Sequence, residues 1–264
     1  MDAFVSPAAL RQQLSIESSP LVVDVRRTAE FLASSETIAG ALRRDPEHAN
    51  EWAPTLPRAA GVVVYCAHGG EVSQGVARAL AELGLSARTL QGGMDAWRAA
   101  AGELAHKPKD ASTRWVTRER PKIDRIACPW LIRRFIDPGA EFLYVPAADV
   151  RRVAAERDAV PYDIPDVRFS HDGERCSFDA FVDAYRLRDP ALAELALIVR
   201  GADTNRLELA PQAAGLAAIS LGLSRLYRDD FEMLAHGMIT YDALYTWCRE
   251  GKDETHTWNP QAYR

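Results

Sequence analysis

The sequence has no long uninterrupted hydrophobic run, and this absence argues against a helix that crosses a membrane. No window of the 264 residues approaches the roughly 18 consecutive apolar residues that such a helix needs. The first residues, MDAFVSPAALRQQL, have neither a basic start nor a continuous apolar stretch, so they do not resemble a secretion signal. We therefore expect a cytoplasmic protein with no membrane partner.

Cysteine is scarce, and there is no surplus of positive charge. The four cysteines, Cys66, Cys128, Cys176 and Cys248, are widely spaced, which does not fit a disulfide scaffold or a closely spaced metal-binding pair. The net charge is -5, whereas a general nucleic-acid binder is usually basic. What remains is an ordinary globular composition, 47% hydrophobic and 26% charged, and enough length for two medium domains.

One of the cysteines stands where a buried strand gives way to a helix. The stretch VVVYCAHGGEVSQGVARAL begins with apolar residues typical of a buried strand and shows helical periodicity from Ser73 to Leu80. Cys66 lies between the two, where unpaired N–H groups and the helix dipole stabilise a thiolate. Gly69 and Gly70 allow the loop to turn its N–H groups inward. The pattern predicts a nucleophile, and the alternative is a buried, unreactive cysteine.

The first hundred residues alternate short apolar runs with helical segments. A helix starts at Ser6-Pro7, and another closes the region over 94–104; the apolar runs between them cover 21–26, 62–66 and 87–93. This order predicts an α/β domain with a parallel sheet covered by helices. Because reactive groups collect at the carboxyl ends of such strands, we expect Asp24 and Arg26 to lie near Cys66.

These elements resemble a rhodanese, a sulfurtransferase domain. The resemblance rests on four stretches in the family's order: VVDVRRTAEF (22–31), IAGAL (38–42), VVVYCAHGGEVS (62–73) and LQGGMDAW (90–97). It implies that Cys66 accepts a sulfane sulfur as a persulfide and that Asp24 and Arg26 support the loop. It also implies that six residues cradle the sulfur through backbone amides: Ala67, His68, Gly69, Gly70, Glu71 and Val72. Sulfur transfer then needs a small-molecule sulfur donor and a thiol acceptor, but no cofactor.

Individual loop residues narrow the chemistry. A phosphatase of the cysteine type needs an arginine six positions after the cysteine to bind the phosphoryl oxygens, and this sequence has Val72 there. Glu71 stands where a cation would help to bind thiosulfate, so a dianionic donor meets a like charge, whereas a persulfide or another thiol-bound species need not. His68 either donates to the thiolate or is an exposed residue without a role.

The second half of the chain has a different, helix-rich pattern. A polar stretch with a proline, AHKPKDAST (105–113), predicts a linker between a domain over 1–104 and a domain over 114–264. Helical periodicity covers 189–202, 210–226, 228–237 and 240–251, while AEFLYVP and DVRFSH predict short strands. We therefore expect an α-rich α+β domain.

This half resembles the C-terminal domain of bacterial chromate-resistance proteins. The match rests on KIDRIACPWLIRRFID (122–137), FSHDGERCSFDAF (169–181), RGADTNRLELAPQAAGLAAISLGL (200–223) and YDALYTWC (241–248). It implies a role in resisting or sensing chromate and supplies no catalytic residue. In the best-known members this domain follows a DNA-binding part, whereas here it follows the rhodanese-like part, so we expect no nucleic-acid partner.

One candidate site in this half is a metal centre. His171, Glu174 and Cys176 are ligand types for a divalent ion such as Zn or Fe, and Asp203, His236, Asp124 and Cys128 are further candidates in the same domain. Each has a simpler explanation. Asp172-Gly173 predicts a tight turn with His171 and Glu174 as its flanks, and Cys176 precedes Ser177, a typical helix cap.

The other candidate site is an oxyanion pocket. Lys122, Arg125 and Arg200 can bind a tetrahedral dianion such as chromate or sulfate. A bound oxidant would then meet Cys128 within DRIACPW, and the alternative is that Cys128 is an unreactive core residue. The leading hypothesis for the whole chain is a sulfurtransferase-type enzyme that carries a persulfide on Cys66 and is linked to chromate or oxidative metal stress. The alternative is a non-catalytic sensor or binding protein for an oxyanion or a metal.

Overall fold

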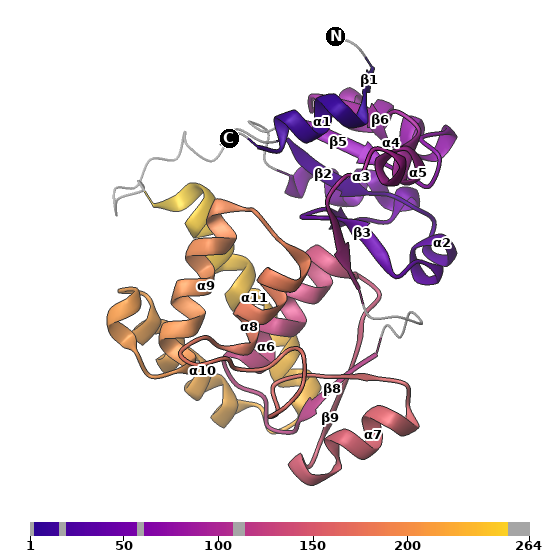
Figure 1. Ribbon diagram of the computed structural model, residues 1–264. Helices are drawn as coiled ribbons and strands as arrows, with labels where there is room; N and C mark the ends of the chain where they lie inside the picture. Colours follow the sequence, from indigo (N-terminus) through magenta and orange to yellow (C-terminus); the bar gives the residue numbers. More distant parts are fainter. Residues whose placement is uncertain (1–2, 16–19, 57–60, 108–113, 253–264) are drawn as a thin grey trace.

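The protein is described by a computed structural model over residues 3–15, 20–56, 61–107 and 114–252. Figure 1 shows two groups of elements side by side: strands and short helices in the N-terminal part, and a mainly helical C-terminal part. Among the described residues, no helix is both long enough and apolar enough to cross a membrane.

A five-stranded parallel sheet forms the centre of the first domain, as predicted. Its order is β1-β6-β5-β2-β4. The strands are β1 (Phe4–Val5), β2 (Leu21–Asp24), β4 (Leu42–Arg43), β5 (Val62–Tyr65) and β6 (Ala87–Leu90). Every residue of β5 is buried, because a central parallel strand is covered on both faces.

Helices cover both faces of this sheet. Val63 and Tyr65 of β5 pack with α1 (Pro7–Gln13) and α5 (Gly93–Ala99) on one face. Val62 and Val64 point to the other face, toward α3 (Ala49–Trp52) and α4 (Glu71–Glu82), because successive side chains of a strand alternate. The domain also contains α2 (Thr28–Ala33) and two 3-10 turns, Pro46–His48 and Ala53–Thr55.

The first domain extends beyond its predicted end at residue 104. Strand β7 (Leu104–His106) pairs antiparallel with β3 (Glu36–Ile38), and the Lys107 N–H donates to the Ser35 carbonyl at 3.0 Å. The helix expected over 94–104 therefore ends at Ala99, because the chain reverses to reach β3. Residues 105–107 belong to this domain rather than to a linker, and the rest of the predicted linker, 108–113, lies outside the described residues.

The second domain is an α-rich α+β domain, as predicted. A three-stranded parallel sheet has the order β10-β8-β9, with β8 (Arg114–Arg118), β9 (Glu141–Val145) and β10 (Val160–Pro161). The helices are α6 (Asp124–Leu131), α7 (Val150–Glu156), α8 (Ser177–Tyr185), α9 (Pro190–Asp203), α10 (Ala213–Leu226) and α11 (Asp230–Thr246). Short turns complete it: the 3-10 turns Ala147–Asp149 and Leu207–Leu209, and the π turns Ile132–Ile136 and Trp247–Gly251.

Two element predictions in this domain were wrong. The segment 166–171 forms no strand, and only Phe169 makes a bridge, to Tyr162. The two helices expected over 228–237 and 240–251 form one continuous helix, α11, with a π turn at its end. Gly237 lies buried within this helix and packs against α6, where a Cβ atom would lie 2.7 Å from Ile126 Cγ2.

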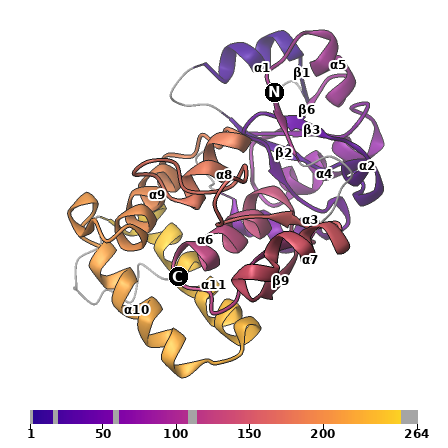
Figure 2. The ribbon, with the colours of Figure 1, turned by 60° about the horizontal axis from the view of Figure 1, so that its bottom comes forward.

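The two domains share contacts through β4 and the segment before β7. Leu42 of β4 is buried in the core of the second domain, and the Gly40 N–H donates to the Tyr185 carbonyl at 3.1 Å. Glu103 forms ion pairs with Arg186 and Arg188. Figure 2 shows the strands of the first domain beside α8 and α6.

Candidate functional site

Cys66 directly follows β5 and begins the loop that leads into α4. Its Sγ atom lies 3.1 Å from the Ser73 hydroxyl oxygen, and the residue is 5% exposed. Burial by itself raises the pKa of the thiol, but the hydrogen bond with Ser73 and the backbone N–H groups of Ser73, His68 and Gly70 outweigh it, so the pKa is lowered from its ordinary value. Hydrogen bonds at this site therefore stabilise a thiolate.

Two glycines allow the loop after Cys66 to pack closely against the start of α5. Gly69 and Gly93 have φ of 67° and 57°. A Cβ atom on Gly93 would lie 2.3 Å from the Cys66 carbonyl oxygen, and one on Gly69 would lie 2.7 Å from the Gly92 nitrogen. The Met94 N–H donates to the Cys66 carbonyl at 3.0 Å. This contact binds the Cys66 carbonyl to α5, while N–H groups of the loop turn toward the sulfur.

The remaining loop residues divide between solvent and core. The His68 side chain is exposed, and its Nδ1 atom lies 2.7 Å from Asp95 Oδ2. His68 thus contributes a backbone N–H to the sulfur, whereas its imidazole pairs with a carboxylate. Glu71 is exposed at the first position of α4, Val72 packs against the core, and Ala67 is half-buried.

Asp24 and Arg26 form a buried ion pair one strand away from the cysteine. Arg26 Nη2 lies 2.5 Å from Asp24 Oδ2, and both side chains are at most 3% exposed. The Tyr65 hydroxyl donates to Asp24 Oδ2 at 2.7 Å, and Arg26 Nη2 donates to the Glu36 carbonyl at 3.0 Å. The pair therefore joins β2, β3 and the residue before Cys66, and it contacts these strands rather than the loop itself.

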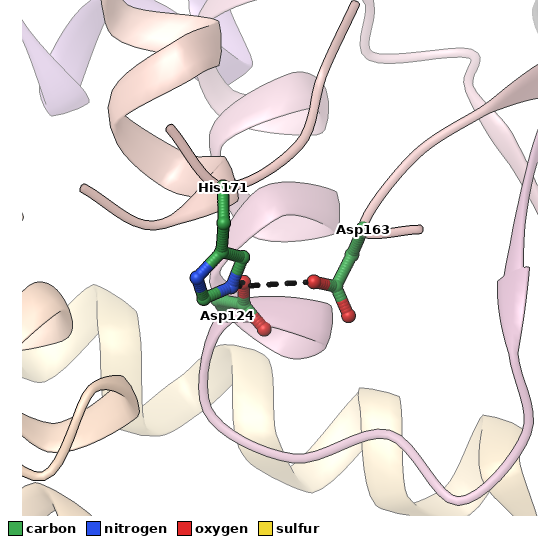
Figure 3. Close-up of side chains that lie close together, drawn as sticks. All are labelled: Asp124, Asp163 and His171. Atoms are coloured by element: carbon green, nitrogen blue, oxygen red, sulfur yellow. Dashed lines mark hydrogen bonds and ion pairs between the residues drawn. The ribbon is translucent and has the colours of Figure 1, made fainter. Parts of the chain in front are cut away.

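In the second domain, His171 lies among three carboxylates from distant segments. Its Nε2 atom is 3.3 Å from Asp124 Oδ2, 3.4 Å from Asp163 Oδ1 and 3.2 Å from Asp203 Oδ2. Figure 3 shows the ring directed toward Asp124 and Asp163, which come from separate parts of the chain. Within the described ranges, potential ligand atoms of Asp124, Asp163 and His171 lie within 4.8 Å of one another. We call Asp124, Asp163, His171 and Asp203 the His171 cluster.

The carboxylates of this cluster lie close together where little solvent reaches them. The side chains of Asp124 and Asp163 are each 3% exposed. The hydrogen bond to Asp124 raises the pKa of His171 to about 9. Burial, followed by the charge of Asp124, raises the pKa of Asp203 to about 8 and also raises the pKa of Asp163. Positive charge is therefore strongly favoured at the centre of the cluster.

The structure does not bring Glu174 into this cluster. The tight turn predicted at Asp172-Gly173 is present: Asp172 and Arg175 form an antiparallel bridge, and Gly173 has φ of 56°. This turn places Glu174 at an exposed tip, where its carboxylate pairs with Arg206. The grouping of His171 with Glu174 is therefore replaced by a grouping of His171 with aspartates.

Cys176 is also outside the His171 cluster, and the cap assigned to Ser177 was wrong. Helix α8 begins at Ser177 with Cys176 as its N-cap residue. Cys176 is fully buried, and its backbone N–H donates to Asp179 Oδ2 at 3.0 Å. The Ser177 hydroxyl donates to Asp163 Oδ1 at 3.1 Å, so it holds one of the cluster's carboxylates instead. His236 stacks on Tyr227.

The arginines expected to bind an oxyanion already have carboxylate partners. Arg125 Nε lies 3.2 Å from Asp163 Oδ2, and Arg200 donates two hydrogen bonds to Asp179, at 2.9 and 2.6 Å. Lys122 is half-buried two residues before Asp124. An anion at this place would have to displace these carboxylates or approach the His171 cluster, so the geometry does not form the expected oxyanion pocket.

Asp163 is the functional candidate that sequence analysis missed. It follows β10 in the stretch VPYDIPDV and adopts φ of 52°. Aspartate is one of the few non-glycine residues that enter this left-handed region readily. The prolines around it are a turn signal, but no spacing in the sequence connects this turn to His171.

The folds and sites above define a chain with a rhodanese-like domain followed by a second, helix-rich domain. A family model for the Rhodanese-like domain matches residues 6–100. The model described as ChrB, C-terminal domain, matches residues 115–248, half of the chain. The chain therefore belongs to the family of proteins with the ChrB C-terminal domain, and both parts of the predicted resemblance are confirmed.

Individual relatives cover only parts of the chain. Protein ChrB of Cupriavidus metallidurans is 36% identical over 133 residues, 50% of this chain and 40% of the relative, so the chain spans less than half of that relative's length. A rhodanese-related protein from Thermoplasma volcanium is 24% identical and covers 40% of this chain and 100% of its own, with a TM-score of 0.36. A rhodanese-like domain protein from Staphylococcus aureus is 23% identical and covers 40% of this chain and 100% of its own, with a TM-score of 0.35.

Proposed function

We propose that the N-terminal domain is a sulfurtransferase that carries sulfane sulfur on Cys66. The observation that carries this proposal is the set of hydrogen bonds around Sγ, from the Ser73 hydroxyl and from the N–H groups of His68 and Gly70. They favour the thiolate, which is the nucleophilic form of cysteine. The match to the Rhodanese-like domain supports the same assignment.

The reaction passes one sulfur atom between thiols in two balanced steps. The Cys66 thiolate attacks the outer sulfur of a donor persulfide; a new S–S bond forms at Cys66, the S–S bond of the donor breaks, and the donor leaves as a thiolate. An acceptor thiolate then attacks the outer sulfur on Cys66 and releases the Cys66 thiolate. The loop N–H groups bind the negative charge that resides on sulfur throughout.

Charge at the loop favours a thiol-bound sulfur donor over thiosulfate. Glu71 is exposed at the start of α4, and the loop from Ala67 to Val72 contains no arginine or lysine. A thiosulfate dianion would approach this carboxylate without a compensating cation, whereas a persulfide carries less negative charge. A low-molecular-weight persulfide is therefore the donor that we assign.

Family membership of the second domain connects this chemistry with metal stress. We infer that the ChrB C-terminal domain links the protein to chromate resistance, with sulfur transfer on the first domain serving the thiols that an oxidising oxyanion consumes. The alternative is a binding or sensing protein in which Cys66 only holds an anion. A serine at position 66 is compatible with that alternative but not with a sulfur carrier.

Intact-mass measurement after treatment with glutathione persulfide tests the assignment. The wild-type protein should gain the mass of one sulfur atom, and Cys66→Ser should gain none. Cys248→Ser is the matched control, because Cys248 is a buried cysteine of the other domain and its loss should leave the gain unchanged. Equal sulfur uptake by wild type and Cys66→Ser would overturn the proposal.

A further inference from the structure

The His171 cluster joins four segments of the second domain at one point. Asp124 is the first residue of α6, Asp163 follows β10, His171 precedes α8, and Asp203 is the last residue of α9. Their side chains meet even though their positions span 80 residues of sequence, and two of the aspartates are almost completely buried. Sulfur transfer on Cys66 uses none of these groups.

The spacing of the donor atoms matches that of ligands around one metal ion. Two ligands at about 2.1 Å from an ion lie about 3.0 Å apart at a right angle and about 3.4 Å apart at the tetrahedral angle. His171 Nε2 lies 3.2 to 3.4 Å from one oxygen of each aspartate. The imidazole nitrogen and each carboxylate oxygen thus already have the separation of ligands that share an ion.

The carboxylates of the cluster have unequal access to positive charge. Asp163 has Arg118 at 2.7 Å and Arg125 at 3.2 Å. For Asp124 and Asp203, His171 is the cationic partner found in the described part of the chain. The carboxylates of Asp124 and Asp203 thus share one imidazole nitrogen, and a cation bound between them would offset their mutual repulsion.

A buried thiol beside the cluster provides a second, independent observation. Cys128 lies one helical turn after Asp124 on α6 and is fully buried. Its thiol interacts electrostatically with Asp124, Asp163 and Asp203, and it forms no hydrogen bond to any residue that the structure describes. Cys128 therefore adds a buried sulfur, a donor type for transition metals, on the same side of α6 as Asp124.

We propose that Asp124, Asp163 and His171, with Asp203 as a fourth ligand, bind a divalent first-row transition-metal ion. Carboxylate oxygens suit Mn²⁺, and an imidazole nitrogen extends the preference to Fe²⁺ and Zn²⁺ while disfavouring Mg²⁺ and Ca²⁺. The His171 side chain is 41% exposed, which gives an ion a path from solvent. The bound ion would fix α6, α9 and the two loops to one another.

Titration of the full chain with Mn²⁺, followed by the electron paramagnetic resonance signal of the free ion, tests this site. After removal of metals with a chelator, the protein should bind one Mn²⁺ and melt at a higher temperature with the ion than without it. His171→Gln and Asp203→Asn should each weaken binding by about tenfold or more. Glu174→Gln is the matched control: Glu174 lies in the adjacent turn but pairs with Arg206, so binding should not change.

The metal-free melting temperature separates a binding role from a structural one. Asp203→Asn removes one of the crowded carboxylates, so the metal-free variant should be at least as stable as the metal-free wild type while it binds Mn²⁺ less tightly. A variant that melts lower without metal and binds Mn²⁺ as tightly as wild type would assign the cluster to structure alone. Failure of Mn²⁺, Fe²⁺ and Zn²⁺ all to bind the wild type would overturn the proposal.

Discussion

The Cys66 loop and the His171 cluster stabilise charge in opposite ways. Around Cys66, the negative charge of a thiolate is stabilised by a serine hydroxyl and backbone N–H groups, without a cation. Around His171, three carboxylates each approach one imidazole nitrogen to 3.4 Å or less, and Asp163 also pairs with two arginines. The first arrangement suits an anionic sulfur species and the second suits a cation, so the two domains are built for different ligands.

The two sites also differ in how the chain assembles them. The Cys66 loop lies between consecutive elements, β5 and α4, and is pinned by the start of α5. The His171 cluster depends on the packing of α6, α8 and α9 against one another. The contacts between the domains that are named above, at Gly40, Leu42 and Glu103, involve neither site. A change in one site should therefore leave the chemistry of the other intact.

The largest effect on this comparison is expected from Gly93→Ala. The new Cβ atom would lie 2.3 Å from the Cys66 carbonyl oxygen, and φ at this position is 57°, so the substitution should cost about 2 kcal/mol or more of the free energy of unfolding. The displaced loop should lose most of its sulfur uptake in the intact-mass assay, while Mn²⁺ binding in the other domain persists.

Gly75→Ala provides the control for that experiment. Gly75 lies inside α4, where a Cβ atom meets nothing within 4 Å, so alanine should stabilise the helix by up to about 1 kcal/mol. Full sulfur uptake by Gly93→Ala would show that the contact between the loop and α5 does not shape the site.

The residues of the Cys66 loop are close together in the sequence, whereas those of the His171 cluster are not. This difference explains why the sequence predicted the position of the first candidate site but only part of the second. The position of Cys66 at the end of a strand and before a helix could be predicted, because a strand pattern, two glycines and a helix pattern follow one another within 19 residues. His171 was recognised as a ligand type, but its partners are chosen by packing. Asp163 lies in an irregular turn, and Glu174, which is closer to His171 in the sequence, is carried away by the turn at Gly173. Spacing along the chain identifies residues that share one element, but it does not specify which loops converge.

A smaller effect is expected from Ser73→Ala, which removes the side-chain hydrogen bond to the thiolate. The pKa of Cys66 is below its ordinary value in the native protein, so the rate of alkylation by iodoacetamide should rise with pH around a midpoint below that of a free cysteine. Without the Ser73 hydroxyl, burial still raises the pKa of Cys66, and only the backbone N–H groups remain to lower it. The midpoint should then move up by about one pH unit.

The full pH profile distinguishes this electrostatic effect from a loss of structure. Well above the midpoint both proteins carry the thiolate, so their alkylation rates should converge, whereas a distorted site would remain different at every pH. Ser34→Ala, which removes a hydroxyl that bonds to the Glu36 carbonyl, should leave the midpoint unchanged. A midpoint that is the same in Ser73→Ala and wild type would mean that the backbone N–H groups alone set the pKa.

The smallest effect is expected from Glu71→Arg, which reverses the charge at the mouth of the Cys66 loop. Because Glu71 is exposed, solvent screens its charge, and the change should improve the kcat/KM for thiosulfate only several-fold. Turnover of a persulfide donor should change less, and the gain with thiosulfate should shrink as salt is added. Glu82→Arg makes the same change in net charge at the other end of α4 and should have little effect. An equal gain from both substitutions would show that net charge, and not the position of Glu71, limits the use of thiosulfate.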